Sequence, residues 1–231
     1  MKNNLLILPL TCCALSSLPA QSLIVNFNGS TVAGTEHFYS PTDGDVVWGS
    51  DTLNFDFENF QDSSSTGNHA GVFDNDGSTF GETGVSYFFV RDQTVDSTGI
   101  TATLTISGFS GDNYKLELIS SVYSDTGVRL ADIQVNGSFA DSGGGVALYG
   151  DDYNAYTDGF LTGTPLTWNN VVPTGVSNDT ITLTVATSGQ DLMGFINGLR
   201  ITVIPEPATM GLFIGLGLIP CCMLARNRKY R

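Results

Sequence analysis

The chain has 231 residues, four cysteines and a formal net charge of −14 at pH 7. Residues 21–203 contain 22 Asp and Glu residues but only four Lys and Arg residues, a net charge of −18. Such a surface repels phosphate polymers and anionic lipid headgroups, which excludes nucleic-acid binding. The cysteines lie outside this segment, at Cys12, Cys13, Cys221 and Cys222. Residues 21–203 must therefore fold without disulfides.

Residues 1–20 have the organisation of a secretory signal peptide. Lys2 supplies a positive start, Leu5–Leu18 is mostly apolar, and Leu18-Pro19-Ala20 precedes Gln21. Cleavage is expected after Ala20. The sequence therefore predicts that the secretion machinery exports the chain.

Short runs between residues 21 and 203 alternate apolar and polar side chains. In Ile100–Ile106 the apolar residues share one face and threonines the other, which is typical of an antiparallel sheet with one face in a core. More continuous apolar runs at Ser22–Phe27 and Val85–Val90 predict interior strands. Similar alternation occurs at residues 114–118, 131–135, 181–185 and 199–203. With Gly/Asn/Asp turns between them, these strands predict one all-β domain, an antiparallel β-sandwich or jelly roll.

One strand and turn in this domain resembles a known fold family. Asp132-Ile-Gln-Val-Asn-Gly137, placed before a last strand at Phe195–Val203, is similar to a segment of galactose-binding-like jelly rolls. The resemblance implies a jelly roll. The stretch Asp141–Pro165, rich in Gly, Asp and Tyr, is expected to be a long loop or an insertion between strands.

Asp74-Asn75-Asp76-Gly77 is the best candidate for a metal site, and calcium is the only cofactor that we infer. Two carboxylates and an amide within three positions, followed by glycine, supply several oxygen ligands on a sharply curved backbone. The later Glu of an EF-hand loop is missing. The alternative is an Asx-rich turn without metal.

Aromatic side chains interleaved with Asp and Asn suggest a glycan site. Sugar rings present C–H faces to aromatic rings, while their hydroxyls bond to polar side chains. The alternative is that these aromatics close the ends of the core. The candidate glycan-binding residues are Tyr149, Tyr153, Tyr156 and Trp168.

Catalytic machinery is not evident. The domain has no cysteine and no Gly-X-Ser-X-Gly elbow, and its two histidines, in a polar loop (His69) and at His37, have no metal-binding spacing. We therefore expect a protein that is not an enzyme. A polysaccharide hydrolase or lyase using paired carboxylates is the remaining catalytic alternative.

The C-terminus carries the most specific pattern. Pro205-Glu206-Pro207 precedes an uncharged run of 18 residues, Ala208–Ala225. As a helix this run is about 27 Å long, near the lower limit for crossing a bilayer. A basic tail follows it, at Arg226, Arg228, Lys229 and Arg231. Basic flanks stay cytoplasmic, so the domain before the span is expected outside.

Residues 204–231 are similar to the PEP-CTERM sorting signal, which has this order of motif, span and basic cluster. The resemblance implies processing by an exosortase in a bacterium with an outer membrane and an exopolysaccharide system. It also implies delivery to the cell surface or extracellular matrix, where extracellular polysaccharide is a candidate partner. We expect a structural or adhesive role, with a carbohydrate-binding module as the alternative. A plain C-terminal anchor without processing is the other interpretation of the tail.

Overall fold

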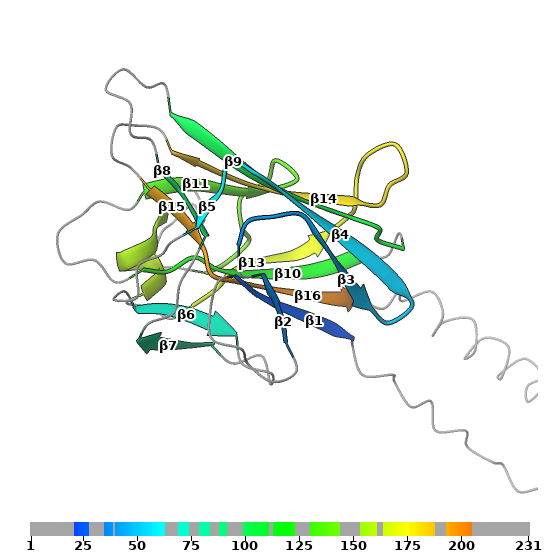
Figure 1. The fold of residues 1–231 in the computed structure, drawn as a ribbon, viewed down its shortest axis with the longest axis horizontal. Coiled ribbons are helices and arrows are strands. Elements are labelled where there is room, and N and C mark those ends of the chain that lie inside the picture. The colour runs from blue at the N-terminus through cyan, green and yellow to red at the C-terminus, as the bar shows by residue number, and fades with distance from the viewer. Residues whose placement is uncertain are drawn as a thin grey trace, which may run out of the picture.

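Figure 1 shows a computed structural model of the chain, which is almost entirely β-strand in its described part. One helical turn occurs there, the π-helix η1 (Ala155–Phe160). The residues that the structure describes are 21–27, 35–38, 40–62, 69–73, 79–83, 88–91, 99–110, 113–122, 130–143, 153–160, 164–187 and 193–204.

Two large sheets lie face to face (Figure 1). The first contains, in spatial order, β13 (Leu166–Val171), β10 (Asn113–Ile119), β16 (Gly198–Ile204), β1 (Ser22–Phe27) and β2 (Glu36–Phe38). The second contains β12 (Tyr153–Asn154), β11 (Leu130–Val135), β14 (Thr180–Thr187), β9 (Ile100–Ser107), β4 (Asp51–Glu58) and β3 (Gly44–Trp48). Pairing within them is antiparallel except between β1 and β2. The prediction of an all-β, sandwich-like, antiparallel fold is confirmed.

Alternating side chains build the core between these sheets. In β9, Ala102, Leu104 and Ile106 are buried, while the intervening threonines face outward. The neighbouring strand β14 buries Ile181 and Leu183 in the same way. Side chains from both sheets form one continuous hydrophobic cluster. Burial of apolar area, at roughly 25 cal/mol per Å², thus takes the place of disulfides in holding the domain together.

Two smaller elements flank the large sheets. A short sheet contains β15 (Met193–Ile196), β8 (Phe88–Arg91) and β5 (Gln61–Asp62), and a hairpin contains β6 (His69–Phe73) and β7 (Thr79–Thr83). Strand β6 contacts β1, β10 and β16, so the hairpin lies against the first sheet (Figure 1). The sequence predicts a polar loop at His69, and this prediction is wrong. His69 begins β6, where it lies opposite Thr83 of β7 in the hairpin.

The segment Asp141–Pro165 is more structured than expected. It contains β12, which pairs with the start of β11, and η1, which follows directly. The Asn154 side chain begins this turn, since its Oδ1 accepts hydrogen bonds from the backbone N–H groups of Tyr156 (3.0 Å) and Thr157 (3.4 Å). The residues of η1 have no apolar periodicity of the helical kind, so the sequence did not predict a helix here.

The beginning and the end of the described chain lie side by side. Strand β1 pairs with β16, with Ser22 opposite Thr202. Strand β1 therefore begins, and strand β16 ends, at the same end of the first sheet, where residues 1–20 and 205–231 are joined to the domain.

Candidate functional site

Several predicted functional residues lie outside the described residues. They are the sorting motif Pro205–Pro207, the basic tail from Arg226 to Arg231, Tyr149, and the calcium candidates Asp74, Asn75 and Asp76. The calcium candidates belong to the connection between paired strands β6 and β7. Within the described ranges, no three His, Cys, Asp or Glu side chains come together as a metal site. The same ranges contain no helix with the length and apolar character to span a membrane.

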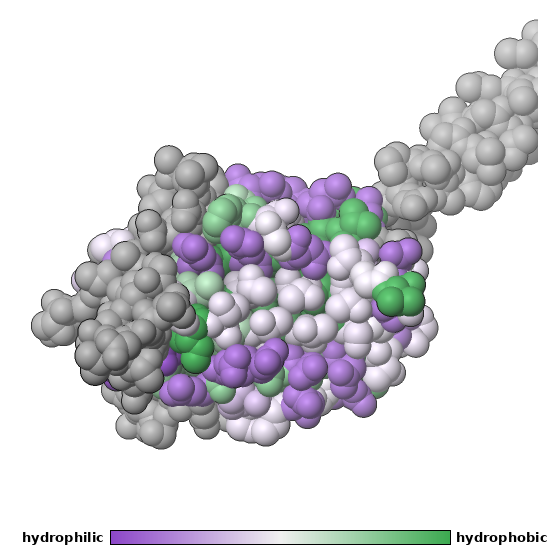
Figure 2. All heavy atoms as spheres, turned by 90° about the horizontal axis from the view of Figure 1, so that it is seen from above, coloured by the Kyte–Doolittle hydropathy of each residue, from purple (hydrophilic) through white to green (hydrophobic). Residues whose placement is uncertain are grey.

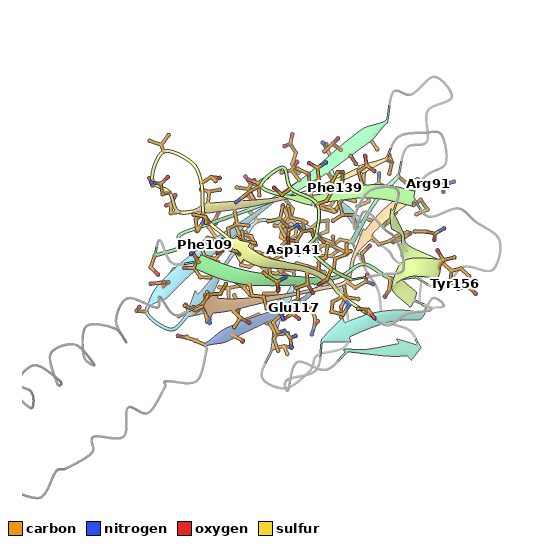
Figure 3. The ribbon with its side chains drawn as sticks, turned by 180° about the vertical axis from the view of Figure 1, so that it is seen from behind. Arg91, Phe109, Glu117, Phe139, Asp141 and Tyr156 are labelled. Atoms are coloured by element: carbon orange, nitrogen blue, oxygen red, sulfur yellow. The ribbon has the colours of Figure 1, made fainter. Side chains whose placement is uncertain are left out.

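Two aromatic residues of the glycan hypothesis, Tyr156 and Trp168, lie in different elements of the fold. Tyr153 begins β12, and Tyr156 lies partly buried in η1 at one end of the sandwich (Figure 3). Trp168 in β13 is only 3% exposed, and its Nε1 donates a hydrogen bond to the Ser138 carbonyl oxygen at 2.9 Å. Its ring is thus part of the core.

A shallow hollow lies instead where strands β11 and β13 border the same open side of the sandwich. Strand β13 is the edge of the first sheet, and β12 covers only the first two residues of β11. The hollow has a volume of about 280 Å³. Its lining residues are Val135, Asn136, Ser138, Phe139, Asp141, Trp168, Asn170, Val171, Val172 and Thr174.

A tight hairpin turn forms one wall of the hollow. Asn136 and Gly137 have φ values of 49° and 75°, and Val135 and Ser138 exchange backbone hydrogen bonds of 2.9 Å. Positive φ at both central positions defines a type I′ turn, which Asn-Gly favours. The Asn136 side chain donates to the Val172 carbonyl oxygen (2.9 Å) and accepts from the Thr182 N–H (2.8 Å). This amide therefore ties the turn to two other segments.

A β-bulge in β13 forms the opposite wall. Tyr114 and Leu116 of β10 are two residues apart, but their partners Val171 and Trp168 are three apart, so β13 carries one extra residue. Consequently Asn169 and Asn170 are both exposed. The Asp141 carboxylate oxygen Oδ2 accepts the N–H of Asn169 at 2.6 Å. Bulges redirect side chains, and this one brings Asn170 into the lining of the hollow.

The floor of the hollow is apolar, and its rim combines apolar and polar side chains. Buried Val135, Trp168 and Val171 underlie it, whereas Phe139 is 37% and Val172 49% exposed. Figure 3 shows Phe139 and Asp141 on this side of the molecule. The Asn170 side chain makes no hydrogen bond to the described part of the chain, and the Asp141 carboxylate has one oxygen, Oδ1, without such a bond. An apolar base with unengaged polar groups at the edge is the usual form of a small-ligand site.

A second polar cluster lies on the outer face of the first sheet. Glu117 is 5% exposed and accepts hydrogen bonds from Arg200 Nε at 2.6 Å and Lys115 Nζ at 3.0 Å. Burial raises the pKa of its carboxyl group, but the hydrogen bonds and charges of Arg200 and Lys115 outweigh this and hold the pKa below its ordinary value. Two of the domain's four cations thus compensate one buried charge. The cluster is suited to holding strands β10 and β16 together, not to acid–base chemistry.

The outer face of the second sheet is rich in hydroxyl groups. Figure 2 looks onto this face, where pale side chains lie between purple rows. Threonines of β9 and β14 form its centre, with Thr105 opposite Thr182 and Thr103 opposite Thr184. Along β4 the border is acidic. The pKa of the Asp56 carboxyl group is raised above its ordinary value. The largest cause is desolvation, followed by the charge and hydrogen bond of Asp43 and by the charge of Glu58.

The residues that distinguish the hollow were not singled out from the sequence. Phe139 and Asp141 belong to the segment that follows the type I′ turn, and Asn170 belongs to the bulge. One local signal was available: the adjacent polar pair Asn169-Asn170 interrupts the apolar–polar alternation of β13. Nothing local indicates that the turn after β11 faces this bulge, because that contact joins the edges of two different sheets.

Comparisons of the chain with protein-family models, with curated protein sequences and with solved structures found no match.

Proposed function

We propose that the chain is the precursor of an exported, non-enzymatic surface protein of a bacterium with an outer membrane. In this proposal residues 1–20 are a signal peptide, residues 21–203 a jelly-roll type ectodomain, and residues 204–231 a PEP-CTERM sorting signal that includes a transmembrane helix at 208–225. The observation that carries the proposal is the order of Pro205-Glu206-Pro207, uncharged span and basic tail. The mature domain then has a structural or adhesive role at the cell surface or in the matrix.

The fold supports this proposal in two ways. The first strand lies beside the last, as in a jelly roll, so the leader and the sorting signal join the same end of the sandwich. The outer face of the second sheet is rich in hydroxyl groups and has an acidic border, which suits solubility in an extracellular matrix.

Processing in a host with an exosortase tests the sorting signal. The full chain, with an epitope tag after Arg231, is expressed and fractionated, and the mature C-terminus is measured by mass spectrometry. We expect loss of the tagged segment and appearance of the domain at the surface. Glu206→Gln should remain uncleaved at the inner membrane, whereas the control Glu58→Gln, at an exposed position of β4, should be processed normally. Equal retention of wild type and both variants would indicate a plain anchor.

A carbohydrate-binding module is the second candidate function. The observation that favours it is the hollow, which combines the exposed Phe139 ring with the unengaged groups of Asp141 and Asn170. Isothermal titration of the full chain with neutral extracellular polysaccharide tests it. Saturable heat without release of any sugar product supports binding without catalysis, while product release would support the enzyme alternative.

A further inference from the structure

The hollow between β11 and β13 is held in shape before any ligand arrives. The type I′ turn, the two hydrogen bonds of the Asn136 amide and the Trp168 indole bond to Ser138 join the turn to β13, β14 and the segment after β13. Across the hollow, Asp141 satisfies the N–H of Asn169 at the bulge. The protein therefore loses little conformational entropy when a ligand enters this site, which favours binding even of a small molecule.

The chemistry of the lining selects the ligand. We propose that the hollow binds one pyranose ring of a neutral saccharide, an inference that rests on the carbohydrate-binding function and assigns it a place. The C–H face of the ring packs on Phe139 and Val172, which supply exposed apolar area. Ring hydroxyls donate to Asp141 Oδ1, and the Asn170 amide both donates to and accepts from its neighbours on the ring.

Size and charge narrow the ligand further. A volume of about 280 Å³ lies at the lower end of small-molecule sites, which accommodates one sugar ring. The lining contains one carboxylate and no cation. Two of the three basic residues in the described part, Lys115 and Arg200, are engaged by Glu117 on another face. An acidic sugar would meet Asp141 without any compensating positive charge, so uncharged sugars are preferred.

The two tryptophans of the chain make a reporter available. Trp168 lies in the floor of the hollow, whereas Trp48 is a buried residue of β3 that packs near Tyr114, with ring centroids 6.1 Å apart. In the full chain carrying Trp48→Phe, Trp168 is the sole source of indole fluorescence. The protein is purified in a detergent without a sugar headgroup. It is titrated with the methyl glycosides of glucose, galactose, mannose and N-acetylglucosamine, and with glucuronate.

We expect a saturable change in Trp168 emission with at least one neutral sugar, at a Kd of about 1–10 mM, a range that corresponds to a few contacts with one ring. Phe139→Ala and Asn170→Ala should each weaken binding by about tenfold or more. Asp141→Asn keeps an acceptor for the Asn169 N–H and should weaken binding without unfolding the bulge. The matched control is Val176→Ala, in the exposed turn before β14, which should leave binding unchanged.

Three other results would overturn the inference. Calorimetry could detect sugar binding that neither changes Trp168 emission nor is weakened by Phe139→Ala. In that case the carbohydrate function stands and the hollow is not its site. If none of the sugars binds the full chain at concentrations up to about 50 mM, well above the expected Kd, the hollow is rejected as a pyranose site. The carbohydrate function is rejected as well only if the polysaccharide titration also gives no saturable heat. Glucuronate binding as tightly as glucose would contradict the preference for uncharged sugars.

Discussion

Removal of the buried charge at Glu117 should destabilise the domain in a pH-dependent way. Glu117→Gln preserves the size of the side chain but removes the carboxylate charge that Arg200 and Lys115 contact. Breaking a fully buried ion pair costs about 3–5 kcal/mol, and a hydrogen bond to a charged group contributes about 1.5–3 kcal/mol. Since Arg200 and Lys115 are partly exposed (side chains 20% and 37%), solvent screening lowers this range. We expect a loss of about 1–3 kcal/mol at pH 7.

The pH dependence follows from the direction of the pKa shift. Because the folded-state pKa of Glu117 lies below its ordinary value of 4.5, the ionised form is favoured in the folded protein. The stabilisation is fully present above the unfolded-state pKa and is lost as the pH falls through the folded-state pKa. The difference between wild type and Glu117→Gln should therefore be largest near neutral pH and shrink in the acid range.

This difference is measured by denaturant unfolding of the full chain, monitored by tryptophan fluorescence. The measurement is made at pH 7 and at intervals down to pH 3. At roughly 2–4 °C per 1 kcal/mol for a domain of this size, thermal midpoints at pH 7 should fall by about 2–12 °C. The control Glu58→Gln, which removes an exposed carboxylate from β4, should stay within about 0.5 kcal/mol of wild type. A Glu117→Gln variant as stable as wild type, or a gap that does not depend on pH, would refute the reasoning.

Three further substitutions test other parts of the molecule. Because Asp56 is exposed and solvent screens its charge, Asp56→Asn should raise stability at pH 7 by less than about 1 kcal/mol. The raised carboxyl pKa means that ionisation is unfavourable in the folded state above that pKa, so a lower denaturation midpoint for the variant would contradict the prediction. Gly194→Ala should cost about 1–3 kcal/mol, because its methyl group would collide with Val185 in the core; an unchanged midpoint would show that the core can yield. Calcium at about 100 times its Kd should raise the thermal midpoint by about 5–10 °C, and Asp74→Ala/Asp76→Ala should abolish the rise; no rise in wild type would favour the metal-free turn.

Much of the strand layout was predictable from side-chain alternation. Ser22–Phe27 forms β1, and the alternating runs around Leu104, Leu183 and Ile201 form β9, β14 and β16. Such patterns are informative because a half-buried strand must place every second residue in the core. Likewise Asn136-Gly137 is a turn in the structure, since few other dipeptides accept positive φ at both positions.

The surroundings of the aromatic rings show what local patterns do not reveal. Tyr156 and Trp168 are near one another in the sequence, but a partly buried π-helical turn holds one and a core position of β13 the other. Conversely, the exposed aromatic ring beside a hollow is Phe139, which no motif distinguishes. Whether an aromatic ring faces water or the core depends on which sheet covers it, and alternation within one strand carries no such information.

The amino-acid sequence by itself determined the all-β class, the acidic character of the domain, its lack of disulfides and the order of strands and turns along the chain. These properties follow from composition and from the two-residue period of a strand, both of which are local. Only the tertiary structure decided that β1 lies beside β16, that Glu117 is compensated by Arg200, and that the turn at Asn136 faces the bulge at Asn169. Each of these contacts joins residues far apart in sequence, and the choice among such partners is made by the packing of the whole core.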